Sequence, residues 1–92
     1  MVIANQNARK YVENRQVFTG SHTFSEYAKN KNGGELYVVF SYGYHFPLFV
    51  FTENQWYFNK DKYSVTTSKH KSQLRPNVTN FIELNTQELK EL

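Results

Sequence analysis

The sequence predicts an α+β domain: a small antiparallel β-sheet of three to five strands around an aromatic core, with one or two short helices. Residues 35–58 contain three segments rich in β-branched and aromatic residues, separated by short turns. Eight phenylalanines, seven tyrosines and one tryptophan supply the core. Each can bury about 150–250 Å², so a few buried rings stabilise a chain of 92 residues, which is long enough for one domain only.

The first residues are polar, with weak helical spacing through Val2, Ile3 and Tyr11. We therefore expect residues 1–14 to form a flexible or weakly helical N-terminal arm. Residues 15–92 are expected to form the single α+β domain.

The segment that precedes the sheet is expected to be mostly irregular. Residues 16–19 read Gln-Val-Phe-Thr, which predicts a short strand ended by Gly20. Residues 21–34 are predicted to be mostly loop, with a helical turn at residues 25–28. Residues 30–34 read Asn-Lys-Asn-Gly-Gly, which is strong turn chemistry.

Three strands are predicted in the middle of the chain. Residues 35–41 are apolar on both faces when read with a period of two, which indicates a central strand covered on both sides. Residues 43–45 form a hairpin connection to a second strand at residues 46–52. Pro47 lacks an N–H group and is expected at a strand start, an edge or a bulge. A turn then leads to the third strand, which starts at residues 56–58.

The C-terminal third is predicted to contain helix and strand in turn. Residues 66–75 read as a short helix or a structured loop, with one of residues 66–68 as the N-terminal cap. Residues 81–84 are a candidate final strand. Thr86 is expected to cap a last helical turn over residues 87–92.

The composition bears on the cellular compartment. The absence of cysteine excludes disulfides and thiolate zinc sites, and it favours a reducing cytoplasm. The N-terminus lacks the pattern of a signal peptide, and no apolar stretch approaches about 20 residues. We therefore expect a cytoplasmic protein that does not interact with a membrane.

A basic segment follows the predicted third strand. The net charge is only +3, but residues 60–75 contain a single acid, Asp61, and five cations: Lys60, Lys62, Lys69, Lys71 and Arg75. One interpretation is an anion site, in which Thr67 and its neighbours and a helix start hold a phosphate. Tyr57, Tyr63 or Trp56 would stack on bases. The alternative is a solvated cationic helix that binds nothing.

The three histidines suggest a metal site only weakly. His22, His45 and His70 show neither HxH nor HExxH spacing. No nucleophile elbow and no pair of carboxylates is visible. We therefore predict a non-enzymatic protein without a cofactor, and keep a metal-dependent hydrolase that uses His45 and His70 as an alternative.

Amphipathic tyrosines offer a further alternative. Some of the four tyrosines Tyr37, Tyr42, Tyr44 and Tyr57 are expected to be exposed. Exposed tyrosines beside arginine and histidine are a composition common at protein interfaces. The same residues therefore fit a protein-binding surface as well as a nucleic-acid-binding one.

Three stretches together carry a family resemblance. Residues 37–47 read YVVFSYGYHFP, residues 56–59 read WYFN and residues 63–76 read YSVTTSKHKSQLRP. In this order they resemble small, poorly characterised proteins of bacteriophages and related mobile elements. The resemblance covers about residues 35–76 and implies a phage-related origin, but it carries over no catalytic residue. It also implies that a set of residues acts together: Ser41, Tyr42, Gly43, His45, Pro47, Asn59, Tyr63, Ser64, Thr67, His70 and Arg75.

The leading prediction is a small accessory protein that binds nucleic acid where the turn at residues 42–47 meets residues 66–75. This meeting point is a binding surface or, alternatively, a structural latch held by a hydrogen bond between Tyr42 and His70. The alternative function is inhibition or modulation of a host protein, of the anti-CRISPR or nuclease-inhibitor kind, and a homodimer is left open. The candidate binding residues are Tyr42, Tyr44, His45, Tyr57, Lys60, Lys62, Tyr63, Thr67, Lys69, His70, Lys71 and Arg75.

Overall fold

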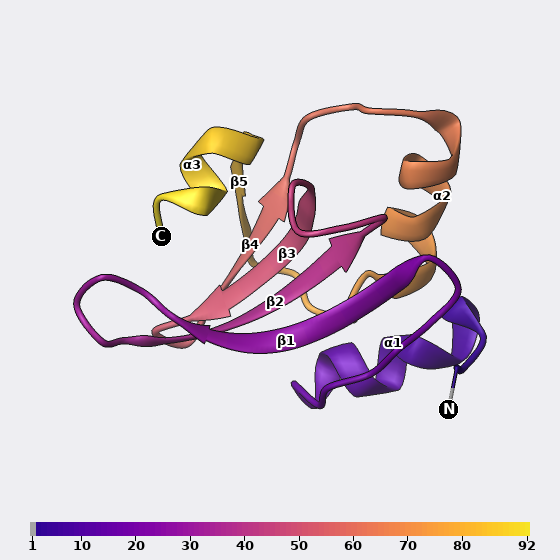
Figure 1. Ribbon diagram of the computed structural model, residues 1–92, viewed down its shortest axis with the longest axis horizontal. Coiled ribbons are helices and arrows are strands. Elements are labelled where there is room, and N and C mark those ends of the chain that lie inside the picture. The colour runs from indigo at the N-terminus through magenta and orange to yellow at the C-terminus, as the bar shows by residue number, and fades with distance from the viewer. Residues whose placement is uncertain (1) are drawn as a thin grey trace.

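A computed structural model describes residues 2–92 as one five-stranded sheet with three helices (Figure 1). The strands lie in chain order across the sheet, β1-β2-β3-β4-β5. The predicted α+β class with an aromatic core is confirmed, with one helix more than expected. The elements are α1 (Asn5–Glu13), β1 (Thr23–Lys29), β2 (Glu35–Ser41), β3 (Pro47–Thr52), β4 (Gln55–Asn59), α2 (Val65–Leu74), β5 (Phe81–Leu84) and α3 (Thr86–Lys90).

The predicted central strand is confirmed as β2. It pairs antiparallel with β1 on one side and with β3 on the other. Tyr37 and Val39 point into one core and Val38 points into the other, so both faces are buried. Pro47 begins β3 opposite Phe40, next to a break in register between Val39 and Phe40, as expected for a residue without an N–H group.

The prediction for residues 16–34 was largely wrong. Of residues 16–19 only Thr19 forms a β-bridge, with Phe24, whereas the strand β1 occupies half of the expected loop. The polar residues of β1 can be buried because they are hydrogen-bonded. Thr23 Oγ1 donates to Asn5 Oδ1 at 2.7 Å, and Ser25 Oγ accepts from Phe18 N at 3.0 Å. The turn at residues 30–34 is confirmed by two backbone hydrogen bonds between Asn30 and the glycines.

The sheet is mixed rather than purely antiparallel. The β5 strand is present at the predicted residues, but it pairs parallel with β4, from Trp56 opposite Phe81 to Asn59 opposite Leu84. A parallel neighbour requires a long crossover connection. Residues 60–80, which include α2, form this crossover and place a helix beside the end of β4.

The first helix is part of the domain and not a separate arm. Ala8 and Val12 of α1 are fully buried, in the same core as Leu74 of α2. Asn5 Oδ1 also accepts from Ser21 N at 3.0 Å, which joins the start of α1 to the chain before β1. Residues 5–13 are therefore held as a regular helix, in place of the expected flexible or weakly helical arm.

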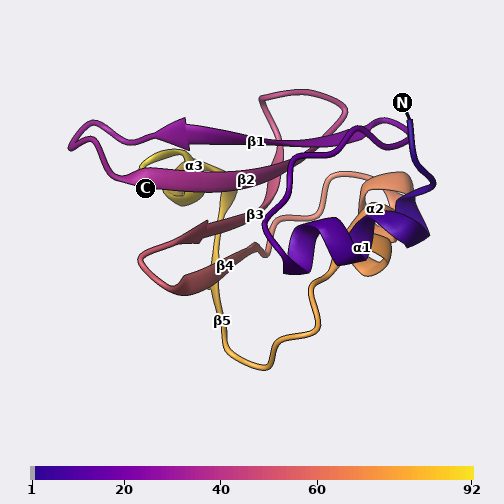
Figure 2. The ribbon, with the colours of Figure 1, turned by 90° about the horizontal axis from the view of Figure 1, so that it is seen from below.

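The helices divide between the two faces of the sheet. The two helices α1 and α2 lie side by side, and α3 lies apart from them (Figure 1, Figure 2). Leu89 of α3 packs against Val38 and Val50, on the face opposite Ala8 and Leu74. Within residues 2–92 no helix has the length and apolar character needed to cross a membrane.

Of the residues considered as caps, Ser64 caps α2, whereas α3 is capped by a residue that was not predicted. Ser64 Oγ accepts from Thr67 N and caps α2, so residues 66–68 lie inside the helix. Asn85 caps α3 in a reciprocal capping box with Glu88, in place of Thr86. Serine and asparagine in extended backbone place a side-chain oxygen on a free N–H group of the first turn.

Candidate functional site

The turn between β2 and β3 does meet α2, as the sequence predicted. His70 Nδ1 lies 2.8 Å from Ser41 Oγ, and both side chains are buried. The expected hydrogen bond between Tyr42 and His70 is replaced by this one, because Ser41 points to the helix side of the sheet. The Tyr42 ring instead packs on the His70 ring, with centroids 5.5 Å apart.

Tyr42 lies between two histidine rings. Its centroid is 5.2 Å from that of His22 and 5.5 Å from that of His70. His22 and Tyr42 both adopt left-handed backbone, with φ of 60° and 67°, and Tyr42 N donates to His22 O at 2.8 Å. Bulky residues rarely adopt this conformation. The Tyr42 ring is thus packed against two histidine rings while about half of the residue stays exposed.

The histidines do not assemble a metal site. Burial, and then the charges of His22 and Lys69, lower the pKa of His70 below its usual value. His45 is exposed and lies against Tyr63, with centroids 6.4 Å apart. No three side chains of His, Cys, Asp or Glu within residues 2–92 are grouped so as to hold a metal ion. The pair of Ser41 and His70 therefore joins α2 to the sheet.

Most of the predicted cations do converge. A cavity of about 250 Å³, which we call the basic pocket, lies between the end of β4 and α2. Four cationic side chains and two serine hydroxyls line it, and no acidic side chain does. The lining residues are Phe58, Lys60, Lys62, Ser68, Lys71, Ser72 and Arg75.

Two of the four cations are held in place by aromatic rings. The Arg75 guanidinium carbon lies 5.3 Å from the centre of the Phe58 ring and 4.5 Å from that of Phe81. Lys71 Nζ lies 5.3 Å from the Phe58 ring and donates to Asp61 O. Burial lowers the pKa of Lys71, and the nearby charge of Asp61 partly opposes this effect. These contacts fix the two charges at the wall of the basic pocket.

The single acid of the segment is hydrogen-bonded to α3 and does not line the basic pocket. Asp61 Oδ2 accepts from Thr86 N at 2.9 Å, at the start of α3. Hydrogen bonds from Thr86 are the main cause that lowers the pKa of Asp61, and the charges of Lys71 and Lys60 lower it further. The carboxylate therefore caps the start of α3 and offsets part of the positive charge beside the basic pocket.

Several predicted site residues lie elsewhere. Thr67 is buried, and its hydroxyl hydrogen-bonds Ser64, so it is not at the surface. Tyr57 packs with the cluster of Val38 and Leu89, on the opposite face of β4 from Phe58. Lys69 is exposed outside the basic pocket, and Tyr63 is exposed next to Lys62. Ser68, one of the hydroxyl residues expected at an anion site, does line the basic pocket, whereas Ser72 and Phe58 are pocket residues that the sequence did not single out.

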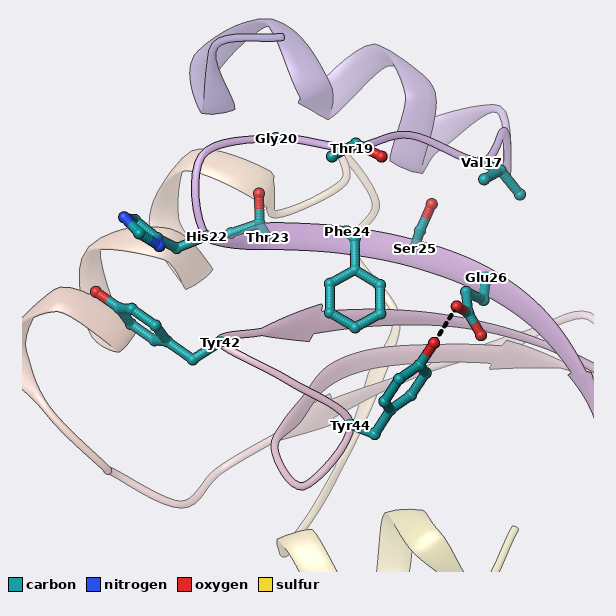
Figure 3. Close-up of a pocket in the computed structure, with 10 residues that line it drawn as sticks. All are labelled: Val17, Thr19, Gly20, His22, Thr23, Phe24, Ser25, Glu26, Tyr42 and Tyr44. Atoms are coloured by element: carbon teal, nitrogen blue, oxygen red, sulfur yellow. Dashed lines mark hydrogen bonds between the residues drawn. The ribbon is translucent and has the colours of Figure 1, made fainter. Parts of the chain in front are cut away.

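A larger concave surface lies beside β1. We call it the aromatic groove (Figure 3); its volume is about 590 Å³. Tyr42 and Tyr44 were predicted site residues, whereas the contribution of β1 was missed because that segment was read as loop. The lining residues are Val17, Thr19, Gly20, His22, Thr23, Phe24, Ser25, Glu26, Tyr42 and Tyr44.

The interior of the aromatic groove is ordered by ring contacts. The Phe24 ring stacks on Phe40, with centroids 5.0 Å apart, and Tyr44 meets both rings edge-on at 5.2 Å. Tyr44 Oη donates to Glu26 Oε2 at 2.5 Å (Figure 3). This hydrogen bond raises the pKa of Tyr44. Glu26 is the only acidic residue that lines the groove, and no lysine or arginine lines it.

No family model matches the sequence, and neither the curated proteins nor the solved structures contain a match. The two concave surfaces, one basic and one aromatic, are therefore the basis for assigning a function.

Proposed function

We propose that this protein is a non-enzymatic cytoplasmic accessory protein of a bacteriophage or mobile element, and that it binds nucleic acid through the basic pocket. One observation carries the proposal. Lys60, Lys62, Lys71 and Arg75 line a single cavity from which acidic side chains are absent. Four positive charges around one cavity exceed the single nearby charge of Asp61 and favour an anionic group.

The chemistry of the basic pocket fits a phosphate group. Arg75 presents a planar fork of donors that matches phosphate oxygens, and the hydroxyls of Ser68 and Ser72 add neutral donors. Lys71 and Arg75 are already held against Phe58, so binding orders fewer free side chains. A preorganised pair of charges beside the two exposed lysines Lys60 and Lys62 is suited to hold one backbone phosphate.

Further cations extend the basic surface along the helices. Arg9 of α1 donates from Nη2 to Ser72 O at 2.8 Å, which brings a fifth positive charge beside the basic pocket. Lys69 is exposed on α2. About four to six phosphate contacts predict a salt slope of roughly −3 to −5, which corresponds to moderate binding that weakens steeply with salt.

Anisotropy titrations test this proposal directly. Labelled single-stranded and duplex oligonucleotides are titrated with the protein between about 50 and 200 mM salt. Lys62→Ala is expected to weaken binding to every sequence and to reduce the salt slope by about one. Lys31→Ala, which removes an exposed lysine in the turn between β1 and β2, is the matched control and is expected to change neither.

Two results would contradict the proposal. One is an absence of binding at low salt, and the other is an equal response to Lys62→Ala and Lys31→Ala. Either would direct attention to the alternative, a modulator of a host protein that uses the exposed tyrosines Tyr42 and Tyr44.

A further inference from the structure

The aromatic groove is lined by one phenylalanine, Phe24. Phe40, on which Phe24 stacks, does not line the groove. Tyr42 packs against His22 and His70, and Tyr44 forms a T-shaped pair with Phe24. Figure 3 shows the Phe24 ring between these two tyrosines. Phe24 is therefore the platform on which a flat ligand would stack.

A fixed acceptor lies at the correct spacing from this platform. Glu26 follows Phe24 by two residues in β1, so both side chains leave the same face of the strand, about 6–7 Å apart. That spacing is close to the width of a purine. Tyr44 holds one carboxylate oxygen, Oε2, and so orients the carboxylate while the second oxygen retains its acceptor capacity.

The charge of the groove selects the ligand. Its only acidic residue is Glu26, and no lysine or arginine lines it, so a phosphate is disfavoured there. A carboxylate favours a planar group that carries N–H donors, and guanine offers two adjacent ones at N1 and N2. Adenine and cytosine offer one amino group on that edge. The volume of about 590 Å³ falls in the usual range for small-ligand sites.

We propose that the aromatic groove binds one unpaired guanine base, stacked on Phe24 and hydrogen-bonded through its Watson–Crick edge to Glu26. The proposal rests on the proposed nucleic-acid function, since the base belongs to the nucleic acid that the protein is proposed to bind. The base must be unpaired because its Watson–Crick edge has to be free to bind Glu26. The proposed ligand is therefore a single-stranded nucleic acid.

Free nucleosides test the groove separately from the basic pocket, because they carry no phosphate. NMR titration with guanosine is expected to shift the Phe24 and Glu26 signals, with affinity about tenfold higher than for adenosine or uridine. Glu26→Gln is expected to abolish this preference. Phe24→Leu is expected to weaken all nucleosides about fivefold or more.

Controls separate loss of binding from loss of structure. Glu83→Gln makes the same chemical change at an exposed position of β5 and is expected to leave guanosine binding unchanged. The NMR spectrum of each variant, recorded before nucleoside is added, shows whether that variant is folded. Should Phe24→Leu fail to fold, Glu26→Gln alone still decides the preference for guanosine.

Two outcomes would overturn the inference. One is guanosine binding no tighter than uridine. The other is binding of N-acetyl-arginine amide in place of guanosine, which would assign the groove to an arginine of a protein partner. Failure of the proposed function looks different: oligonucleotides then show no salt-dependent binding, whereas guanosine still shifts the groove signals.

Discussion

Asn59 joins three segments of the chain at the end of β4, although its side chain lines neither the basic pocket nor the aromatic groove. It is fully buried. Its Nδ2 donates to Pro47 O at 2.7 Å and to Thr86 Oγ1 at 3.0 Å, and its Oδ1 accepts from Asp61 N at 2.8 Å. One amide therefore ties the start of β3, the start of α3 and the chain that leads into the basic pocket.

Asn59→Ala is expected to lower the free energy of unfolding by about 3 kcal/mol, at roughly 1 kcal/mol for each hydrogen bond lost. The carbonyl of Pro47 and the N–H of Asp61 would lose their buried partner, which adds to the cost. A domain of this size has a total stability of about 5–10 kcal/mol. The corresponding fall in Tm is about 12–24 °C.

Urea unfolding followed by tryptophan fluorescence measures this loss. Trp56 is the only tryptophan, and it is buried near Asn59 in the same strand. Asn80→Ala removes an exposed asparagine and is expected to change the stability by less than about 0.5 kcal/mol. If Asn59→Ala lost no more than Asn80→Ala, the three hydrogen bonds would not have the energetic role described.

Two further predictions concern α2. Because the pKa of His70 is lowered in the folded protein, the unfolded chain binds a proton more readily, so stability is complete above about pH 6.5 and falls as the pH drops below it. His70→Asn, which retains a partner for Ser41, is expected to flatten the Tm measured against pH; an unchanged slope would show that another group is responsible. Ser64→Ala removes the cap of α2 and is expected to lower the free energy of urea unfolding by about 1 kcal/mol, whereas Ser64→Asp retains most of it. Equal losses in the two variants would argue against a capping role.

The central strands were predictable because their signals are local. Residues 35–41 are apolar on both faces, and the turn chemistry at residues 30–34 lies directly before them. The position of Pro47 at a strand start was predictable because proline has no N–H group to donate to a neighbouring strand. No contact with a distant residue is needed to predict these features, which is why the sequence sufficed.

The first and last strands depend on distant partners. Thr23 and Ser25 look like loop residues until Asn5 and Phe18 supply their hydrogen bonds. A signal was nevertheless present, because a strong turn followed by a seven-residue strand implies a partner strand before the turn. The parallel pairing of β5 depends on where the crossover returns, which no local pattern records.

The candidate site was predicted in part for the same reason. The charge of a side chain follows directly from the sequence, so the four cationic residues of the basic pocket could be predicted as site residues. The sequence could not show that Lys69 and Thr67 lie outside the basic pocket. Their positions depend on which side of α2 faces the sheet. Phe24 and Glu26 were missed together with β1, since alternation on a strand has meaning only once the strand is recognised.

The parallel crossover between β4 and β5 has a consequence for the order of folding. Strands β1 to β4 are joined by short turns between antiparallel neighbours, so they close small loops at low entropic cost. Pairing β5 with β4 closes the much longer loop of residues 60–80 and is expected to come later. Phe58 lies on the early meander, whereas Lys71 and Arg75 lie within that late loop. The basic pocket is therefore expected to be completed in the last stage of folding, so a nascent chain that has formed only the strands β1 to β4 would lack it.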